Sequence, residues 1–395
     1  MKRFFLTGAV LISVIFAGYL ASCSSSDLEV GKAEKTKGSF QPTKPKLKVF
    51  LENSGSMDGY MCDGSDLKDA VYDYLSDLNG CTDTMSLNYI NSQVIPYEND
   101  LESYIKNLNP ISFKNAGGNR SNSDLSSCIK TVLNETNDNT VGMFISDCIL
   151  DLTEANANKL LTNCKITIKN AINEKRKKVT DLGVIVVKMT SDFNGKYFYA
   201  DGGEEELSNV ERPYYIWLFG DKKHLRSIME NAPLEDLSKY GFKEYVAFAN
   251  IDKVDFEIGS KKNIKYKKIK SNKGKFEAII NVDFKSTLQP DSVLTTINNY
   301  EITDKSIKIE SIKSTKEEYT HNLRINIPEE CTSTKVAVTL KRPDMPKWVK
   351  VTNDETGNNI KKNIDKTTGI KHLIDGVAES YEKENVAELI LTLKK

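Results

Sequence analysis

The sequence predicts a doubly wound, mainly parallel α/β sheet, followed by an all-β sandwich and a short C-terminal helix and strand. Two patterns carry this prediction. From residue 47 to about 247, short apolar runs alternate with helical periodicity, which is typical of a parallel sheet covered by helices on both faces. From 248 to 345, short and often alternating strands are separated by turn residues, which favours a sandwich.

The first region, 47–247, contains the elements of the expected α/β sheet. Hydrophobic periodicity predicts strands at 47–51, 141–145, 183–189 and 214–219, two short strands around Asn91 within 85–94, and helices at 66–78, 101–108, 123–133, 153–173 and 222–230. The segment 190–213 is predicted to be an insertion in this domain. Its Asn194-Gly195 pair is a hairpin turn signal, and it interrupts the alternation of strands and helices.

The second region, 248–345, differs from the first in pattern and in charge. Its strands are predicted at 264–269, 276–284, 292–300, 306–312, 322–327 and 335–340, which indicates an immunoglobulin-like sandwich. Acidic residues outnumber basic ones in 49–160, and the reverse holds in 251–350, although the whole chain is neutral with 55 residues of each kind. Nothing in this balance indicates a nucleic-acid partner. The extension 346–395 is predicted to add a helix and a strand.

The N-terminus has the layout of a secretory signal. Lys2 and Arg3 precede an apolar run that ends in Leu20-Ala21-Ser22-Cys23. These four residues resemble the lipobox of bacterial lipoproteins, which implies a signal peptide at 1–22, an acyl chain such as palmitate on Cys23, and anchoring to a membrane of the cell envelope, with the outer membrane expected. The alternative is a plain transmembrane anchor, because the run is just long enough to span a bilayer. The polar, Lys-, Gly- and Pro-containing segment 23–46 is predicted to be a flexible tether.

Polar loops follow three elements of the first region. The strand at 47–51 leads into Glu52-Asn53-Ser54-Gly55-Ser56, the segment 117–125 (GGNRSNSDL) opens a helix, and the strand at 141–145 ends at Ser146-Asp147-Cys148. Ligands collect at the carboxyl ends of strands in open parallel sheets. We therefore expect these three loops to converge on one site.

Together these loops resemble the von Willebrand factor type A (vWA) domain and its metal-ion-dependent adhesion site. The resemblance covers roughly 46–230 and implies a Rossmann-like fold. It implies hydroxyl ligands from Ser54 and Ser56 and a carboxylate from Asp147. Glu52 stands where the family has Asp, and Ser121 is favoured for the Thr of the second loop, with Ser123 and Asn119 as alternatives. The metal ligands expected from the resemblance are Glu52, Ser54, Ser56, Ser121 and Asp147.

Such a donor set suits Mg2+, or alternatively Mn2+ or Ca2+, because hard cations take oxygen ligands and Mg2+ keeps several waters. An open coordination position can then accept a carboxylate from a partner. We expect a non-enzymatic, lipid-anchored protein that captures a protein partner with an accessible carboxylate. One alternative is a metal-independent envelope scaffold. Another is a metal-dependent phosphohydrolase that uses Asp147 and Glu52, although no catalytic base is in view.

Six cysteines remain besides Cys23. They are Cys62, Cys81, Cys128, Cys148, Cys164 and Cys331, and none forms a C-x-x-C pair. An exported chain permits disulfides. Cys62 and Cys148 both follow loops of the expected site, so they are either a disulfide beside the metal or two free buried thiols.

Overall fold

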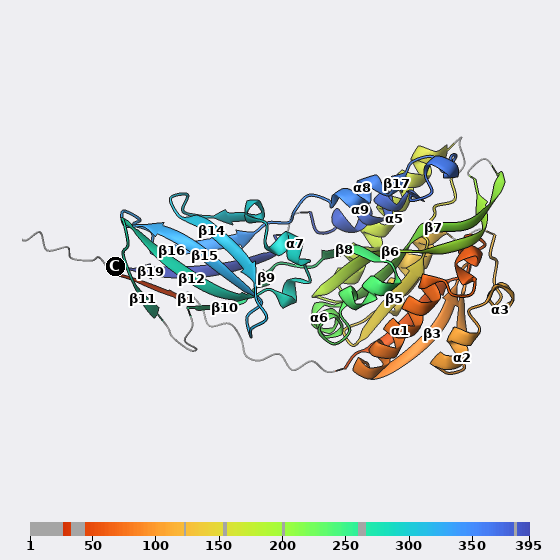
Figure 1. Cartoon of the computed structure of the whole chain (residues 1–395), viewed down its shortest axis with the longest axis horizontal. Coiled ribbons are helices and arrows are strands. Elements are labelled where there is room, and N and C mark those ends of the chain that lie inside the picture. Colours follow the sequence, from red (N-terminus) through yellow and green to blue (C-terminus); the bar gives the residue numbers. More distant parts are fainter. Residues whose placement is uncertain are drawn as a thin grey trace, which may run out of the picture.

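The computed structural model describes residues 27–32, 44–121, 124–152, 156–199, 202–259, 266–382 and 385–395. Two lobes lie end to end, one built on a seven-stranded sheet and one a β-sandwich (Figure 1). The expected signal peptide, Cys23 and Ser123 lie outside the described residues. In the described part of the chain, no helix is long and apolar enough to cross a membrane.

The first lobe is organised by a single mixed sheet. Its strands, in spatial order, are β4 (Val94–Tyr97), β3 (Thr84–Ile90), β2 (Lys46–Glu52), β5 (Thr140–Ser146), β7 (Glu204–Asp221), β6 (Leu182–Phe198) and β8 (Phe242–Phe248). The central strand β5 is buried along its whole length. This continuous burial explains its unbroken apolar sequence, because both faces of the strand are covered.

The prediction of a doubly wound, mainly parallel sheet is wrong. Only the pairings of β2 with β3 and with β5 are parallel in this sheet, and the other four pairings are antiparallel. The cause is the connection between β6 and β7. These strands, 17 and 18 residues long, form one long hairpin instead of a helical crossover, and a hairpin can only join antiparallel strands. The expected insertion 190–213 is therefore the outer part of these two strands.

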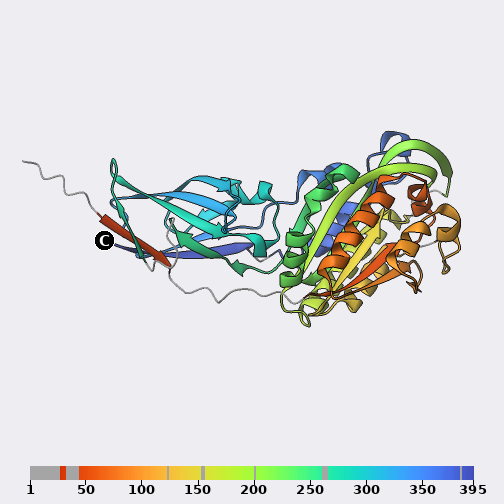
Figure 2. The same cartoon turned by 60° about the horizontal axis from the view of Figure 1, so that its bottom comes forward.

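Helices cover both faces of the sheet (Figure 2). One face packs against α1 (Asp66–Cys81), α2 (Leu101–Lys106), α3 (Pro110–Lys114) and α6 (Lys222–Asn231). The other face packs against α4 (Leu125–Glu135), α5 (Ala157–Arg176), α8 (Lys347–Val351) and α9 (Ile370–Ala378). Each long helix turns its apolar stripe to the sheet, as Leu67, Val71 and Leu78 of α1 do.

The second lobe is a sandwich of two sheets around one apolar core. One sheet has the order β11 (Tyr266–Lys270), β1 (Asp27–Lys32), β19 (Ala387–Lys394), β16 (Lys335–Leu340) and β13 (Tyr300–Ile302), with β9 (Asp252–Lys253) paired to β19. The other has β10 (Asp255–Ile258), β12 (Lys275–Asp283), β15 (His321–Pro328) and β14 (Lys308–Ser314). Alternating burial along β12 and β15 gives the two-residue period of a half-buried strand.

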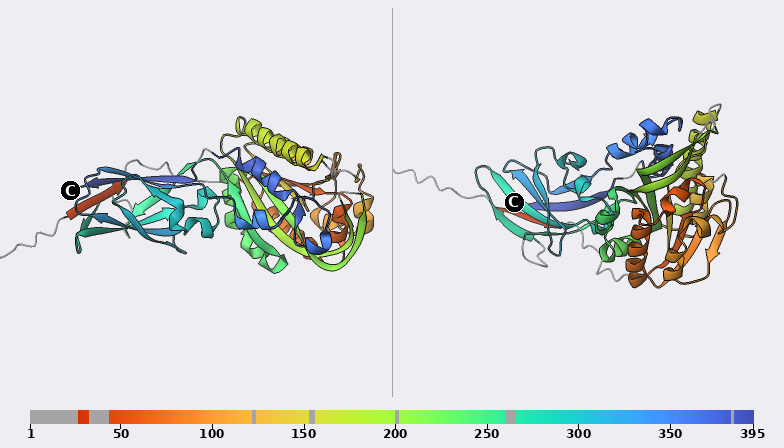
Figure 3. Two further views of the ribbon diagram at one scale, coloured as in Figure 1. Left: turned by 90° about the horizontal axis from the view of Figure 1, so that it is seen from above. Right: turned by 45° about the vertical axis from the view of Figure 1, so that its right-hand side comes forward.

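Two boundaries differ from the sequence prediction. The immunoglobulin-like sandwich expected from 248–345 is incomplete without β1 and β19, which come from the two ends of the chain. Residues 27–32 therefore belong to a sheet and not to a flexible tether. The C-terminal extension 346–395 is divided between the lobes, because α8 and α9 pack on the first lobe beside α5 whereas β19 enters the sandwich (Figure 3).

A candidate cation site at the ends of β2 and β5

The site lies where the neighbouring parallel strands β2 and β5 end. Their register pairs Leu51 with Ile145, so Glu52 and Ser146 lie side by side at the carboxyl ends. The Ser146 hydroxyl donates a hydrogen bond to Oε2 of Glu52. Glu52 is only 2% exposed, so this hydrogen bond helps to satisfy a carboxylate that burial would otherwise destabilise.

Ser54 and Ser56 follow Glu52 at the start of a short 3-10 helix, η1 (Ser56–Met61). Their hydroxyl oxygens are 3.0 Å apart, which brings two neutral oxygen donors together. Gly55 lies between them, and a Cβ there would meet the ring of Phe198 at 3.4 Å. A small residue at 55 therefore allows β6 to approach the loop.

Asp147 follows β5 and is 1% exposed. Its Oδ1 accepts a hydrogen bond from the Ile149 N–H at 3.2 Å, whereas Oδ2 is buried with no well-formed hydrogen bond to any described residue. Burial raises the pKa of this carboxyl, and the nearby Ser56 hydroxyl and the Arg212 charge oppose this rise only in part. A buried oxygen without a partner is costly unless another group satisfies it.

Arg212 of β7 is a buried cation near this carboxylate. The residue is 1% exposed, and its guanidinium lies over the rings of Phe193 and Tyr197, at 5.4 Å and 4.7 Å from their centroids. Its charge lowers the pKa of both Asp147 and Tyr60, in each case against the larger effect of burial. The net charge around Asp147 is therefore less negative than the two carboxylates alone would give.

A second arginine fixes the loop that carries the serines. Arg120 donates from Nε to Oδ1 of Asn53 at 2.6 Å and from Nη2 to the carbonyl of Ser54 at 3.0 Å. It also pairs with Asp58. These contacts hold the loop after β2 against the segment that precedes α4. Ser121 follows directly, with its N–H donating to Oδ1 of Asn119 at 3.0 Å, so the Asn119 side chain turns toward the backbone.

A cavity of about 570 Å3 opens over these groups. Its polar lining residues are Glu52, Ser54, Ser56, Asp58, Arg120, Ser121 and Asp151. Its apolar and aromatic lining residues are Ile149, Leu150, Leu152, Tyr197, Phe198 and Tyr199. Thr368 and Gly357 of the C-terminal segment also line it, so segments that are distant in the sequence meet around the cavity.

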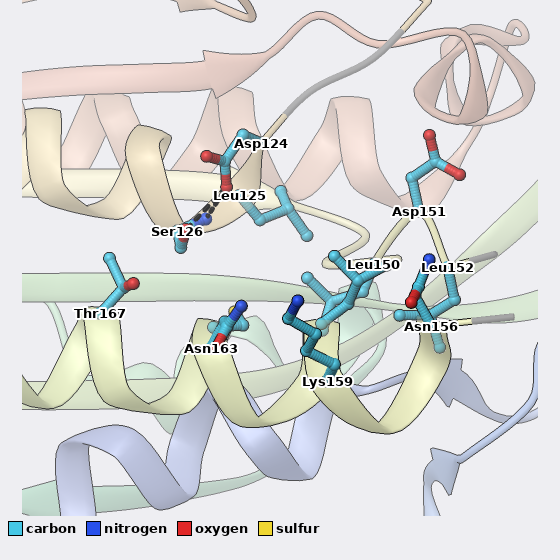
Figure 4. A pocket seen from close by; sticks show the side chains of 12 residues that line it. Asp124, Leu125, Ser126, Leu150, Asp151, Leu152, Asn156, Lys159, Asn163 and Thr167 are labelled. Atoms are coloured by element: carbon cyan, nitrogen blue, oxygen red, sulfur yellow. Dashed lines mark hydrogen bonds between the residues drawn. The ribbon is translucent and has the colours of Figure 1, made fainter.

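A larger cavity of about 710 Å3 lies next to it between α4 and α5 (Figure 4). Leu150, Asp151 and Leu152 line both cavities. The carboxylate of Asp124 in this second cavity already accepts hydrogen bonds from the Ser126 and Ser127 hydroxyls and caps α4. Because its acidic group is committed to the helix end, this cavity is a weaker candidate than the smaller one despite its size.

The structure brings most of the predicted ligands together. Glu52, Ser54, Ser56 and Ser121 line one cavity, and the Ser56 hydroxyl is close enough to Asp147 to lower the pKa of its carboxyl. The described residues contain no cluster of three or more His, Cys, Asp and Glu that could hold a metal. Any cation here would therefore depend on the serine hydroxyls, on water and on a ligand from outside the chain.

The disulfide considered between Cys62 and Cys148 is not formed, and both residues are free thiols. The Cys148 sulfur accepts a hydrogen bond from the Trp217 indole at 3.3 Å, and the Cys62 sulfur contacts the amide of Asn194 at 3.7 Å. The two thiols thus have separate environments. Cys148 also has a φ of 56°, a left-handed conformation that turns the chain directly after Asp147.

Three residues of the candidate site were not predicted from the sequence. They are Arg120, which holds the loop after β2, Arg212, whose charge lowers the pKa of Asp147, and Phe198, which lines the cavity. A lone Arg or Phe in a strand or loop gives no signal of such a role. Comparison of the chain with protein-family models, with curated proteins and with solved structures finds no match.

Proposed function

We propose that this chain is a lipid-anchored, non-enzymatic binding protein of the bacterial cell envelope. In this proposal a hard divalent cation binds at Ser54, Ser56 and Asp147, and the cation captures a protein partner through an accessible carboxylate. The observation that carries the proposal is the buried Oδ2 of Asp147, which lacks a well-formed hydrogen bond among the described residues and lies beside the serine pair. A cation would satisfy this oxygen.

The donor chemistry supports Mg2+ or Mn2+. All candidate ligands are oxygens, and a small hard cation takes carboxylate, hydroxyl and water oxygens in an octahedron. Glu52 is held by Ser146, so it would act through a water and not as a freely moving ligand. The nearby Arg212 charge reduces the attraction for a cation. We therefore expect modest affinity for the cation alone, which leaves coordination positions open for a partner.

The shape of the cavity supports capture of a protruding side chain. A volume of about 570 Å3 is in the range of pockets that enclose small ligands. The wall formed by Leu152, Tyr197 and Phe198 would pack against an apolar group next to the partner's carboxylate. The partner is therefore expected to present an acidic residue beside an apolar one on an exposed loop.

Calorimetry with Mg2+ and with Mn2+ tests the cation site. Wild-type protein should bind one cation per chain, and the double variant Ser54→Ala/Ser56→Ala should lose this binding while keeping the metal-free melting temperature. Ser76→Ala is the matched control, because Ser76 is on α1 and its hydroxyl only donates to the carbonyl of Tyr72. Absence of Mg2+ and Mn2+ binding by wild type would contradict the proposal.

One observation favours the second candidate, a metal-independent scaffold. Arg212 already offsets part of the Asp147 charge, so the buried carboxylate has a counter-charge without any cation. In a scaffold, chelation with EDTA would leave partner capture unchanged. In the proposed function, EDTA abolishes capture and added Mg2+ restores it.

A further inference from the structure

The first described strand ties the start of the chain to the sandwich. Only three residues, 24–26, separate Cys23 from Asp27. Strand β1 then lies between two neighbours, with Glu29 paired to both Lys268 of β11 and Lys394 of β19. A fully extended stretch of this length spans at most about 14 Å, so a lipid on Cys23 would hold this part of the sandwich close to a membrane.

The direction of β1 shows which end of the sandwich this is. Lys32, at the end of β1, pairs with Asp255 at 3.0 Å, and Asp255 pairs across strands with Asp283, which bonds to Arg226 of the first lobe. Lys32 is therefore on the side of the junction between the lobes. Asp27 lies at the opposite end, where β19 also finishes and the C-terminus is seen (Figures 1 and 2).

Exposed lysines gather at this far end. Lys270 ends β11, Lys273 is in the turn that follows it, and Lys394 and Lys395 end the chain. The acidic residues beside them are Asp27, which is paired with Lys268 at 2.7 Å, and the exposed Glu329 and Glu330. The Lys394 Nζ lies 4.1 Å from the centroid of the Tyr266 ring, and the Lys395 Nζ donates to the carbonyl of Glu329. Neither contact neutralises an ammonium charge, so lysines still outnumber acidic side chains among these residues.

We propose that this end of the sandwich faces the membrane, with Lys270, Lys273, Lys394 and Lys395 against the phosphates of anionic lipids. The sandwich is then a stalk that holds the cation site away from the lipid surface. Strand β19, with eight residues, spans roughly 27 Å, so the first lobe begins about that far from the membrane. The inference rests on the lipid anchor of the proposed function and is independent of cation binding.

Energy transfer from the protein to labelled lipid headgroups tests this orientation. Full-length protein, exported and anchored in vesicles, carries a fluorophore on an unnatural residue at position 273 or, in a second sample, at position 114 on α3 of the first lobe. Transfer from 273 should exceed transfer from 114 severalfold, and Cys23→Ala should release the protein. Equal or reversed transfer, or a Cys23→Ala variant that remains anchored, overturns the proposal.

Vesicle flotation of the Cys23→Ala protein tests the lysines separately. Binding to vesicles that contain phosphatidylglycerol should exceed binding to pure phosphatidylcholine. The quadruple variant Lys270→Gln, Lys273→Gln, Lys394→Gln and Lys395→Gln should bind the anionic vesicles roughly a hundredfold to a thousandfold more weakly, since each lysine near an anionic surface contributes about 1 kcal/mol. A matched quadruple on the first lobe replaces Lys106, Lys130, Lys177 and Lys178. An equal loss of vesicle binding in both variants, or no preference for anionic lipid, contradicts the proposed lysine contacts. Mg2+ binding should be unchanged in both variants.

Discussion

The two halves of the seven-stranded sheet contribute different parts of the site. In the parallel half, β2 and β5 end at the same edge, so the loops after them bring Glu52, Ser54, Ser56 and Asp147 together. In the antiparallel half, β6 and β7 continue past the sheet as a ribbon, and this ribbon supplies the aromatic wall and Arg212. The parallel half thus provides oxygen ligands, whereas the antiparallel half provides shape and a counter-charge.

The largest expected effect comes from removing a candidate ligand at the end of the parallel half of the sheet. Asp147→Asn removes the only candidate ligand with a buried oxygen that lacks a well-formed hydrogen bond in the described structure, so we expect Mg2+ affinity to fall by at least about a hundredfold, in line with loss of a carboxylate ligand. Calorimetry on the wild type and the variant measures this change. An affinity within about threefold of the wild type would show that Asp147 holds no cation.

A second substitution disturbs the packing of η1, which follows the parallel strand β2, against β6 of the antiparallel half. A Cβ on Gly59 of η1 would lie 2.4 Å from the buried ring of Phe193 on β6, and overpacking of this kind costs about 1 to 3 kcal/mol. We expect Gly59→Ala to lower the free energy of unfolding by about 2 kcal/mol in chemical denaturation.

The matched control for Gly59 is Gly80→Ala in α1, where a Cβ would meet nothing within 4 Å. It should stabilise by up to about 1 kcal/mol, because Ala favours a helix more than Gly does. Equal effects of the two substitutions would show that the ribbon does not pack tightly on η1.

The pH dependence sharpens the role of Asp147. Burial raises its pKa in the metal-free folded state, so protons compete with the cation. Affinity for Mg2+ should fall as pH is lowered through this pKa, by up to about tenfold per pH unit below it. Titrations at pH values lowered from about pH 8 until the metal-free protein begins to unfold measure this. Unchanged affinity over that whole range would mean that Asp147 is not a ligand.

The same pKa shift contributes to the pH dependence of the free energy of unfolding of the metal-free protein. The folded state binds the Asp147 proton more tightly than the unfolded state, so this contribution to stability is present below the unfolded-state pKa and is lost as pH rises through the folded-state pKa. Asp147→Asn should remove this part of the pH dependence. Denaturation curves in EDTA that fall equally with pH in both proteins would contradict this assignment.

The smallest expected effect concerns the antiparallel half alone. Phe198 of β6 is 46% exposed and lines the cavity. Phe198→Ala should weaken capture of the partner by about 1 kcal/mol, the contribution expected from partial burial of an aromatic ring, without changing Mg2+ affinity. Ile279→Ala on the sandwich, at 38% exposure, is the control. Loss of Mg2+ affinity in the Phe198 variant would mean that the wall also shapes the cation site.

Local sequence signals located the candidate ligands, because the polar residues directly follow apolar runs at 47–51 and 141–145. The arrangement of the antiparallel half was missed, and the turn expected at Asn194-Gly195 was wrong. These two residues lie within β6 at an irregularity of the pairing, and the hairpin connection falls between Phe198 and Glu204. Whether a hairpin interrupts a parallel sheet or forms part of it depends on pairing across the sheet, as between Val186 and Trp217. Strand β1 was missed for the same reason, because its partner β19 lies at the other end of the chain.

The arginines show a similar limit. Arg120 bonds to Asn53, which is 67 residues away in sequence, and Arg212 acts on Asp147 through its charge from a similarly distant position. No local pattern encodes such contacts. Glu52, in contrast, was singled out from the sequence, and the structure shows that its side chain accepts a hydrogen bond from Ser146.

The most direct measurement of the central claim is a crystal structure of the protein soaked in Mn2+, with anomalous scattering recorded. The account predicts one anomalous peak in contact with the hydroxyls of Ser54 and Ser56 and with Oδ2 of Asp147. A peak elsewhere, or none at a Mn2+ concentration that saturates the other divalent sites of the crystal, would contradict it.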